Sequence, residues 1–383
     1  MFRKEIQLYY NGGNMEPLRI LHMIGSLNIG GSQSMVMSLY RKIDRSKVQF
    51  DFIIDHGDHI YYKDEIEKLG GKIYTFPTFK VWNIVEIIKC WNNFFDSHKE
   101  YRVLHSHIRS YASLFLPIAK KNGLKTIIHS HSTSNGKGIV AVIKDIMQLP
   151  LRRQADYMFA CSDEAGRWLF GRKALSKKNY MVIPNAIDSD RFKFNQEKRD
   201  EMRELLHIEN KYVIGTIGRL SAPKNQKFLI EVFSEIHHLD ENTILLIVGD
   251  GELKSLLKKQ VKELGLNESV IFVGSKSNTE DYYQAMDVFA FPSIWEGLGI
   301  SAIEAQCSGL ECVISNCVPK CVDINAGLIK VIDLKDIKEW IKELTPKKTM
   351  KRISRLELVR KSGYDIKENA VLLQKIYCKL ITG

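Results

Sequence analysis

The residues with the clearest capacity for chemistry lie in the segment 291–305, which reads FPSIWEGLGISAIEA. An apolar strand is expected to end at Pro292, a glycine-containing turn to follow, and a helix to open near Ile300. Four backbone amides would then point outward from the start of the helix, those of Gly297, Leu298, Gly299 and Ile300. Free N–H donors and the helix dipole bind phosphate, and glycine lets a diphosphate approach the backbone.

Two acidic residues flank this turn. Glu296 stands at the turn and Glu304 follows on the predicted helix, with seven residues between them. A carboxylate accepts hydrogen bonds from hydroxyl groups, so one acid can hold a sugar and the other a ribose. The alternative needs no ligand, since acidic residues near a helix amino terminus also suit its dipole.

Two cations lie in the segment 218–225 (GRLSAPKN), after the first strand expected in the second half of the chain. They would face the same cleft as the amides of the turn. Arg219 as a planar fork and Lys224 as a point charge can neutralise a departing diphosphate. The alternative is that both are surface cations that cap a loop.

In the first half of the chain, the segment 24–32 (IGSLNIGGS) joins the first expected strand to the first expected helix. Gly25 and Gly30 are five residues apart, so this is not the G-x-G-x-x-G dinucleotide motif. The pair Gly30 and Gly31 belongs to a longer loop that can reach phosphate, or it forms a turn only.

A histidine pair ends a later strand, at His129 and His131. Alternate residues of a strand point in the same direction, so the two imidazoles share a face. We expect no metal here, because no acid or cysteine nearby in the sequence completes a site. His131 lies further out and is expected to contact a sugar hydroxyl, with a purely structural role as the alternative.

The elements that must position these residues alternate along the chain. Strands are predicted at 19–24, 49–54, 72–76, 102–105, 126–129 and 157–160, then at 212–216, 243–248, 270–273, 288–291 and 311–315. Helical patterns lie between them, for example at 34–43, 85–97 and 226–238. Such alternation predicts an α/β protein with two doubly wound, Rossmann-like domains of parallel strands, facing each other across a cleft.

Four regions follow from this pattern. Residues 1–14 fit it poorly and are expected to be an extension outside the folded domains. Residues 15–186 form the first domain, and a break at 184–188 (PNAID) leads to a second domain, residues 187–365. Residues 366–383 are predicted to form a helix that packs back on the first domain.

Charge is unevenly distributed over the 383 residues, whose formal net charge is +11. Residues 101–180 alone hold 14 basic and 4 acidic residues. Such a stretch attracts nucleic acid, anionic lipid or phosphate-bearing substrates, unless it is only a solvated face. The composition is that of a globular protein, and the seven cysteines are expected to be thiols in a reducing cytoplasm.

An apolar stripe interrupts the basic stretch. Residues 139, 142, 143, 146 and 147 are apolar and follow helical spacing. A stripe of this kind is more often core than membrane contact. The basic flanks, however, suit a substrate or surface at a membrane leaflet.

In their order, the motifs resemble those of family 4 glycosyltransferases, which have the two-domain GT-B fold and retain the anomeric configuration of the sugar. The resemblance runs from Leu18 onward. It rests on Gly30-Gly31, His131, Pro184-Asn185-x-x-Asp188, Gly218-Arg219, Lys224-Asn225 and Glu296-x7-Glu304. Segments 309–315, 318–323 and 363–366 are most similar to bacterial exopolysaccharide and capsule enzymes. Glu311 departs from that group, which has proline or a small residue there.

The resemblance implies a role for each motif. Arg219 and Lys224 would bind the donor diphosphate, supported by the amides of residues 297–300 and by the Gly30-Gly31 loop. Glu296 would contact the donor sugar, and Glu304 the ribose hydroxyls. His131 would contact the sugar from the other domain.

The same resemblance implies a hexosyltransferase whose donor is a nucleotide-sugar, expected to be a UDP-sugar. The acceptor would be a saccharide or a polyprenyl-diphosphate-linked saccharide used for cell-surface polysaccharide. No cofactor and no metal are expected, and the D-x-D sequence at 188–190 lies in the linker. The protein would be cytoplasmic, with an anionic membrane surface on the inner face of the plasma membrane as a further partner. A nucleotide-sugar epimerase of the same fold and a basic nucleic-acid-binding protein are the alternatives.

Overall fold

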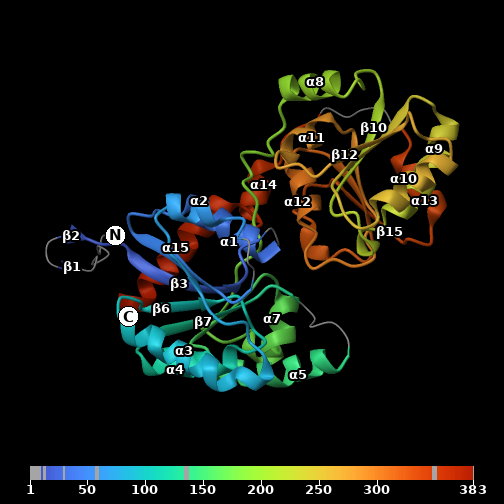
Figure 1. Ribbon diagram of the computed structural model, residues 1–383. Coiled ribbons are helices and arrows are strands. Elements are labelled where there is room, and N and C mark those ends of the chain that lie inside the picture. Colours follow the sequence, from blue (N-terminus) through green and yellow to red (C-terminus); the bar gives the residue numbers. More distant parts are fainter. Residues whose placement is uncertain are drawn as a thin grey trace. The chain divides into compact units, whose positions relative to one another are not determined.

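The computed structural model describes residues 10–11, 14–28, 31–56, 60–132, 138–346 and 352–382 (Figure 1). The chain divides into two compact units, which we call unit 1 and unit 2. Unit 1 comprises residues 1–186 and 366–383, and unit 2 comprises residues 187–365. Each unit is built around its own parallel sheet and its own hydrophobic core.

Unit 1 contains a seven-stranded parallel sheet with the order β5-β4-β3-β6-β7-β8-β9. Its strands are β3 (Leu18–Gly25), β4 (Val48–Ile54), β5 (Ile73–Thr75), β6 (Val103–Ser106), β7 (Lys125–Ser130), β8 (Tyr157–Ala160) and β9 (Tyr180–Val182). Its helices are α1 (Gly31–Lys42), α2 (Lys63–Lys68), α3 (Ile84–Ser97), α4 (Ala112–Lys121), α5 (Ile139–Gln148), α6 (Leu151–Gln154), α7 (Asp163–Phe170) and α15 (Ile366–Thr382).

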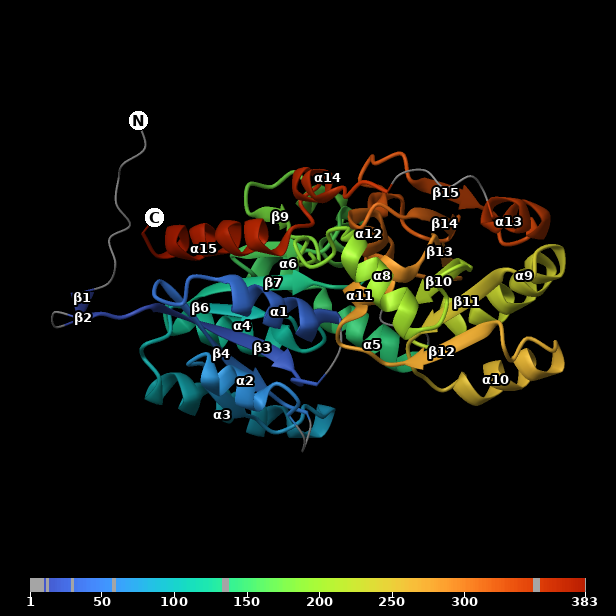
Figure 2. The same cartoon turned by 90° about the horizontal axis from the view of Figure 1, so that it is seen from above.

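Helices cover both faces of this sheet (Figure 2). Neighbouring residues of a strand point to opposite faces, and β3 divides its side chains accordingly. Ile20 packs with α1, α2 and α15, whereas Leu21 packs with α3, α4, α6 and α7. The carboxy-terminal helix α15 therefore belongs to the core of unit 1.

Unit 2 contains a six-stranded parallel sheet with the order β12-β11-β10-β13-β14-β15. Its strands are β10 (Tyr212–Ile217), β11 (Thr243–Val248), β12 (Val270–Gly274), β13 (Val288–Phe291), β14 (Glu311–Ser315) and β15 (Ile329–Ile332). Its helices are α8 (Gln196–Leu205), α9 (Gln226–Leu239), α10 (Lys254–Glu263), α11 (Thr279–Ala285), α12 (Ile300–Cys307), α13 (Ile337–Leu344) and α14 (Leu356–Lys361). One face packs on α9, α10 and α13, and the other on α8, α11, α12 and α14.

The fold contains strands that the sequence analysis did not predict. The edge strands β9 and β15 escaped prediction, because each has only three or four residues and neither is fully buried. Within the segment 1–14, Tyr10–Asn11 (β1) and Asn14–Met15 (β2) form a small antiparallel pair.

Most of the apolar stripe of α5 is not core. Ile139, Val142, Ile143 and Ile146 are all exposed, as is Leu149 directly after the helix. The helix contacts the body of unit 1 through the edge that carries the buried residues Ala141 and Gln148, and Met147 of the stripe packs against the core beside them. The periodicity correctly indicated a helix, but the interpretation of the stripe as core holds only for Met147 and is wrong for the other four residues. None of the described helices is long and apolar enough to cross a membrane.

Candidate active site

The turn predicted to bind phosphate lies between β13 and α12 in unit 2. Gly299 precedes α12 with a φ of +88°. A Cβ added there would lie 3.2 Å from the Phe291 ring and 3.3 Å from Val318 and Val322. The left-handed backbone and the close neighbours together require glycine at this position.

The start of α12 offers free hydrogen-bond donors. Within the described part of the chain, no acceptor engages the backbone N–H groups of Gly297, Leu298, Gly299 and Ile300. The space beside Gly297 is open, since an added Cβ would meet nothing within 4 Å. Unpaired amides at a helix start can bind an anion.

Lys224 and Glu296 meet beside this turn. Lys224 Nζ lies 2.5 Å from Glu296 Oε1, and Ser293 Oγ donates to the same oxygen over 2.7 Å. The Lys224 ammonium also lies 5.0 Å from the centre of the Phe291 ring, a distance typical of a cation–π interaction. Lys224 and Glu296, which the sequence analysis selected separately, are therefore in direct contact.

Two more hydrogen bonds join the loop after β10 to the loop after β13. Asn225 Nδ2 donates to the carbonyl of Pro292 over 3.2 Å. The N–H of Ile294 donates to the carbonyl of Pro223 over 2.8 Å. With the Lys224–Glu296 pair, these contacts make the two loops one connected structure.

Arg219 does not join this pair. Its side chain is 74% exposed, and its Nε lies 3.3 Å from Glu252 Oε2. An exposed ion pair contributes little stability, so the guanidinium can leave Glu252 at small cost. Arg219 is therefore an exposed cation on the same loop as Lys224.

Glu304 lies on α12 and is only partly exposed. The hydroxyl of Tyr283 donates to its Oε2 over 2.8 Å. Burial disfavours the charged carboxylate and raises the pKa of Glu304 to about 7. Glu304 therefore changes its charge near neutral pH.

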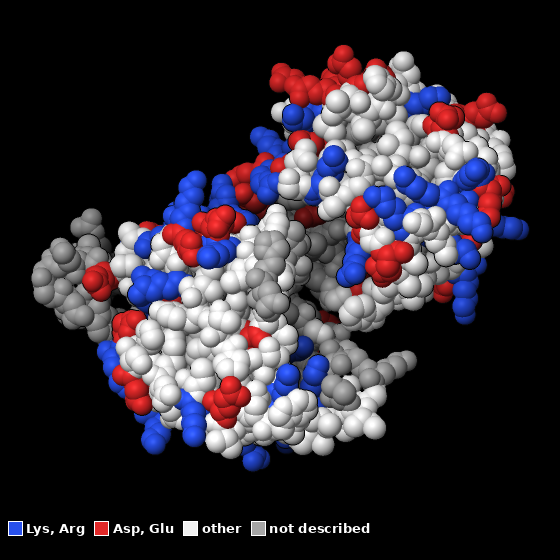
Figure 3. All heavy atoms as spheres, viewed as in Figure 1, with Lys and Arg blue, Asp and Glu red and all other residues white. Residues whose placement is uncertain are grey.

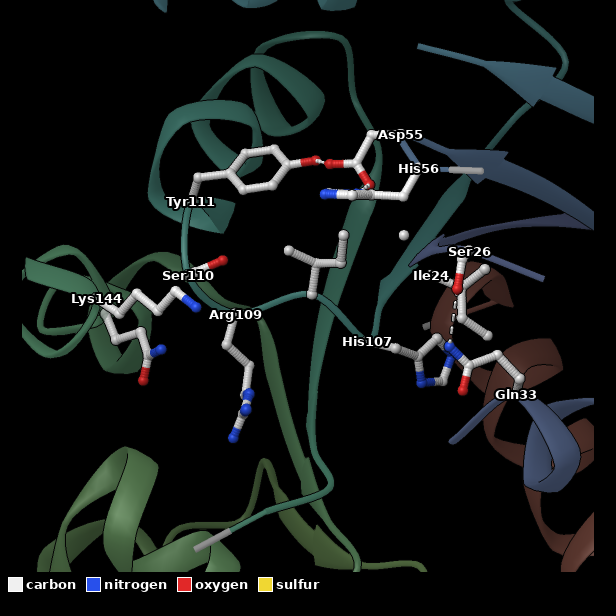
Figure 4. Close-up of a pocket in the computed structure, with 13 residues that line it drawn as sticks. Ile24, Ser26, Gln33, Asp55, His56, His107, Arg109, Ser110, Tyr111 and Lys144 are labelled. Atoms are coloured by element: carbon white, nitrogen blue, oxygen red, sulfur yellow. Dashed lines mark hydrogen bonds and ion pairs between the residues drawn. The ribbon is translucent and has the colours of Figure 1, made fainter. Parts of the chain in front are cut away.

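A pocket of about 410 Å³ opens at the carboxyl ends of β3, β4 and β6 in unit 1 (Figure 4). Asp55 lies in its wall, where it accepts a hydrogen bond from the Tyr111 hydroxyl and lies 2.6 Å from His56 Nδ1. Figure 4 shows both side chains directed at the carboxylate. Asp55 is thus already occupied by two partners.

Positive charge lines another part of the same pocket. Lys144 of α5 contributes an ammonium, and Arg109 contributes a guanidinium that stacks 4.9 Å from the centre of the Trp168 ring. Among the described residues, no group hydrogen bonds to the buried Nη1 of Arg109. Burial also lowers the pKa of Arg109. A buried guanidinium without a partner is stabilised by an anion, so this pocket can bind a phosphate or carboxylate.

The predicted glycine loop is described only in part. Gly31 is the first residue of α1, and an added Cβ would meet nothing within 4 Å. Gly30 lies outside the described residues.

His131 follows directly after β7 and belongs to a larger group. His22, His105, His107 and His129 surround it in unit 1, as described below. Sequence reasoning found His129 and His131 but missed the other three. The same two-residue spacing, at His105 and His107, was the signal that could have found two of them.

Comparison with known proteins identifies the class. The description "Glycosyltransferase Family 4" matches residues 29–191, and "Glycosyl transferases group 1" matches residues 197–370. EpsF of Bacillus subtilis (strain 168), described as a glycosyltransferase, is 31% identical over 95% of this chain and 97% of its own length. The chain therefore belongs to the glycosyltransferases that join a family 4 region to a group 1 region.

Solved structures agree on the fold. HepE from Anabaena in complex with UDP-glucose has a TM-score of 0.66 at 18% identity and covers 95% of this chain and 96% of its own. WaaG, a glycosyltransferase involved in lipopolysaccharide biosynthesis, has a TM-score of 0.66 at 16% identity, with 96% and 100% covered. The two sheets thus form the GT-B fold, as predicted.

A more distant relative carries a detailed name. The UDP-Gal:alpha-D-GlcNAc-diphosphoundecaprenol alpha-1,3-galactosyltransferase of Escherichia coli is 26% identical over 64% of this chain and 66% of its own length.

The histidine group makes unit 1 sensitive to acid. Burial lowers the pKa of His22 and His131 to about 3, and lowers the pKa values of His105, His107 and His129 as well. The unfolded chain therefore binds protons below pH 6.5 that the folded chain does not. Each histidine then costs up to about 1.4 kcal/mol of stability per pH unit. We expect the free energy of unfolding in urea to fall steeply from pH 7 to pH 5.

His129→Phe provides the matched comparison. Within the described residues, no side chain hydrogen bonds to His129, and only the backbone of Ile183 opposes the lowering of its pKa. The variant should therefore fold normally at pH 7 and lose less stability than the parent at pH 5. An equal loss in both proteins would show that His129 does not contribute to acid sensitivity.

Proposed function

We propose that this protein is a retaining hexosyltransferase that transfers a hexose from a nucleotide-sugar, a UDP-sugar in the first instance, to a saccharide or lipid-linked saccharide acceptor. The observation that carries the proposal is the Lys224–Glu296 pair beside the unpaired amides of residues 297–300. The structure of HepE with UDP-glucose supports the donor class, and the E. coli galactosyltransferase supports a diphosphate-linked acceptor. Synthesis of exopolysaccharide or capsule is the corresponding role.

In this proposal, unit 2 binds the donor. The amides at the start of α12 and the cations Lys224 and Arg219 bind its diphosphate, Glu304 binds the ribose, and Glu296 binds the hexose. The bond between the sugar carbon and the diphosphate oxygen breaks, and the acceptor oxygen bonds to the same face of the sugar. The acceptor's proton passes to the departing diphosphate. Fixed positive charge stabilises that diphosphate as its negative charge develops, so the proposal needs no metal.

Unit 1 binds the acceptor in the same proposal, and His131 contacts the transferred sugar. The diphosphate of such an acceptor would supply the hydrogen-bond partner that Arg109 Nη1 lacks among the described residues. Lys144 lines the same pocket and adds a second positive charge. The Gly30-Gly31 loop supports the donor phosphate.

Substitution of the cations tests this function. Arg219→Ala and Lys224→Ala remove charge stabilisation of the leaving group, by about 2.7–4 kcal/mol if the loss resembles that of an oxyanion donor. We expect the turnover number to fall 10²–10³-fold at saturating donor. The measurement is release of nucleoside diphosphate from UDP-, GDP- and ADP-hexoses, with and without saccharide and lipid-linked acceptors.

Lys342→Ala is the control, because Lys342 forms an exposed pair with Glu339 on α13. Normal turnover in both Arg219→Ala and Lys224→Ala would remove these cations from the mechanism. Release of free nucleotide without any acceptor, with the sugar left epimerised, would identify an epimerase instead.

The pKa of Glu304 gives a second test. Its carboxylate can accept two ribose hydroxyls, whereas its protonated form cannot. Since the pKa is about 7, lowering the pH from 8 to 6 should convert most of the carboxylate to the acid. We expect the KM for donor to rise about tenfold over this range. Glu304→Gln should show a weak affinity that does not change with pH, and a pH-dependent KM in this variant would contradict the assignment.

The exposed face of α5 supports membrane docking as part of this proposal. Ile139 and Ile146 are 81% and 61% exposed, and Arg152 and Arg153 follow on α6 with exposed side chains. Figure 3 shows Lys and Arg side chains in the area of α5 among uncharged surface. Apolar residues beside basic ones bind reversibly to an anionic leaflet, at about 1 kcal/mol per engaged cation. A lipid-linked acceptor would be reached from that surface.

Liposome sedimentation tests the docking. We expect strong sedimentation with anionic vesicles at low salt and weak sedimentation at high salt. Val142→Ser combined with Ile146→Ser should weaken it, as should Arg152→Glu combined with Arg153→Glu. Val331→Ser is the matched control, since Val331 is 60% exposed on β15 of unit 2. Absence of sedimentation at low salt would leave α5 and its flanks as a solvated face.

A further inference from the structure

Five histidines gather inside unit 1, at the carboxyl ends of three adjacent strands. They are His22 on β3, His105 and His107 at β6, and His129 and His131 at β7. Parallel pairing places His22 directly beside His105. Neighbouring rings are in close contact, with centroids 5.3 Å apart for His22 and His107 and 5.1 Å apart for His107 and His131.

Three of these rings are joined by hydrogen bonds. His22 Nδ1 lies 3.0 Å from His107 Nε2. The other nitrogen of the central ring, His107 Nδ1, lies 2.8 Å from His131 Nε2. Each contact requires one nitrogen to carry a hydrogen and the other to present a lone pair. His22, His107 and His131 therefore form a continuous chain.

A metal ion bound by these histidines would have to replace the hydrogen bonds that join them. The ring nitrogens of His22, His105 and His107 lie within 4.8 Å of one another, as do those of His107, His129 and His131. Tetrahedral zinc with bonds of about 2.0–2.1 Å would hold its nitrogens about 3.4 Å apart, further than the observed contacts. Both triads consist of histidines alone. Hydrogen bonding accounts for the geometry better than metal binding does.

All hydrogen bonds of this histidine chain must be donated in the same direction, because a neutral imidazole has only one N–H. If His22 Nδ1 donates to His107, then His107 Nδ1 donates to His131 Nε2, and the hydrogen of His131 lies on Nδ1. The opposite direction places hydrogen on His22 Nε2, which is buried and has no acceptor among the described residues. An unpaired buried donor is costly and is rarer than an unpaired acceptor. The first direction places its hydrogen on His131 Nδ1, which is also buried without a partner, so the direction depends on which outer nitrogen has an acceptor beside it.

The surroundings of His131, the last ring of the hydrogen-bonded chain, support donation from His22 toward His131. Asn185 lies beside His131, and its interaction opposes the lowering of the His131 pKa caused by burial and by Arg109. Such an effect arises when an acceptor faces an imidazole N–H. Asn185 Oδ1 and His131 Nδ1 are both buried, and neither makes a hydrogen bond with the described residues. A hydrogen on His131 Nδ1 would give the Asn185 oxygen a donor, so Asn185 is the acceptor that this tautomer requires.

We propose that His22 and His107 are positioning residues that fix His131 in its Nδ1–H tautomer, so that His131 offers a hydrogen-bond donor, and not an acceptor, at Nδ1. This deepens the proposed function, in which His131 contacts the transferred sugar. In the opposite tautomer, His131 would accept a hydrogen bond from a sugar hydroxyl. In the fixed tautomer, it donates one, and Asn185 holds the donor in place when no sugar is bound.

The other two histidines do not belong to the chain. His105 Nδ1 lies 2.6 Å from the Tyr377 hydroxyl of α15. His129 is not joined to the other histidines by a hydrogen bond, and its electrostatic neighbours include the backbone of Ile183. They pack against the chain and exclude water from it. Substitution of His129 therefore provides a control on the same strand as His131.

Nitrogen-15 NMR of histidine-labelled protein reads the tautomers directly, since a protonated ring nitrogen resonates far upfield of an unprotonated one. We expect hydrogen on Nδ1 in His22, His107 and His131. His107→Phe and His22→Phe keep an aromatic ring but remove the donor, so His131 should shift to a mixture of tautomers. His22→Asn places an amide N–H near the former Nδ1 and should restore the parent spectrum. His129→Phe should leave the His131 signals unchanged.

Transfer kinetics give the second measurement. His22→Phe should lower kcat/KM about tenfold, the effect of one hydrogen bond, and His22→Asn should recover it. Hydrogen on Nε2 of His131 in the parent, or an unchanged His131 spectrum in His107→Phe, would overturn the inference. So would stoichiometric zinc in the purified protein that His107→Phe removes. If the tautomers are as expected but His131→Ala transfers sugar normally, His131 does not contact the transferred sugar as proposed. The inference that His22 and His107 fix the tautomer of His131 would still hold.

Discussion

Register between neighbouring parallel strands is the constraint on which the candidate site residues of each unit depend. In unit 1, the pairing of β3 with β6 places His22 beside His105, and in unit 2 β10 pairs with β13. Parallel strands end at one edge of the sheet, so the loops that follow them meet there. A shift of one residue would turn His22 to the opposite face. A similar shift in unit 2 would separate the loops that Lys224 and Glu296 join.

The sequence was sufficient to predict the positions of the strands and helices, but not the contacts between side chains that are distant in sequence. Short apolar runs bounded by turns located most strands within two residues, and the Gly-containing turn correctly predicted a helix at Ile300. Partners distant in sequence were not accessible in this way. The pairing of Lys224 with Glu296 spans 72 residues, and Arg219 on the same loop has a different partner. Helical spacing likewise revealed α5 but could not show which edge of it is covered.

The two units handle charge in different ways. Unit 2 presents formal charges on loops, where a negatively charged ligand can meet Lys224 or Arg219 directly. Unit 1 keeps its five clustered histidines neutral by burying them, and its buried cation, Arg109, stacks on an aromatic ring. Neutral groups in a low dielectric impose direction through hydrogen bonds without a large desolvation cost. One unit is thus suited to stabilise charge and the other to fix orientation.

Gly299 links the donor turn to the core of unit 2. A side chain at this position would press on Phe291, Val318 and Val322 and would need a left-handed backbone, so changes in the turn and in the core affect each other. Even a larger residue at 318 or 322 would press on the turn while Gly299 stays unchanged. Substitutions that adapt the turn to a new donor are therefore expected at positions that face open space. Gly297 is such a position, because a side chain can be added there without repacking the interior.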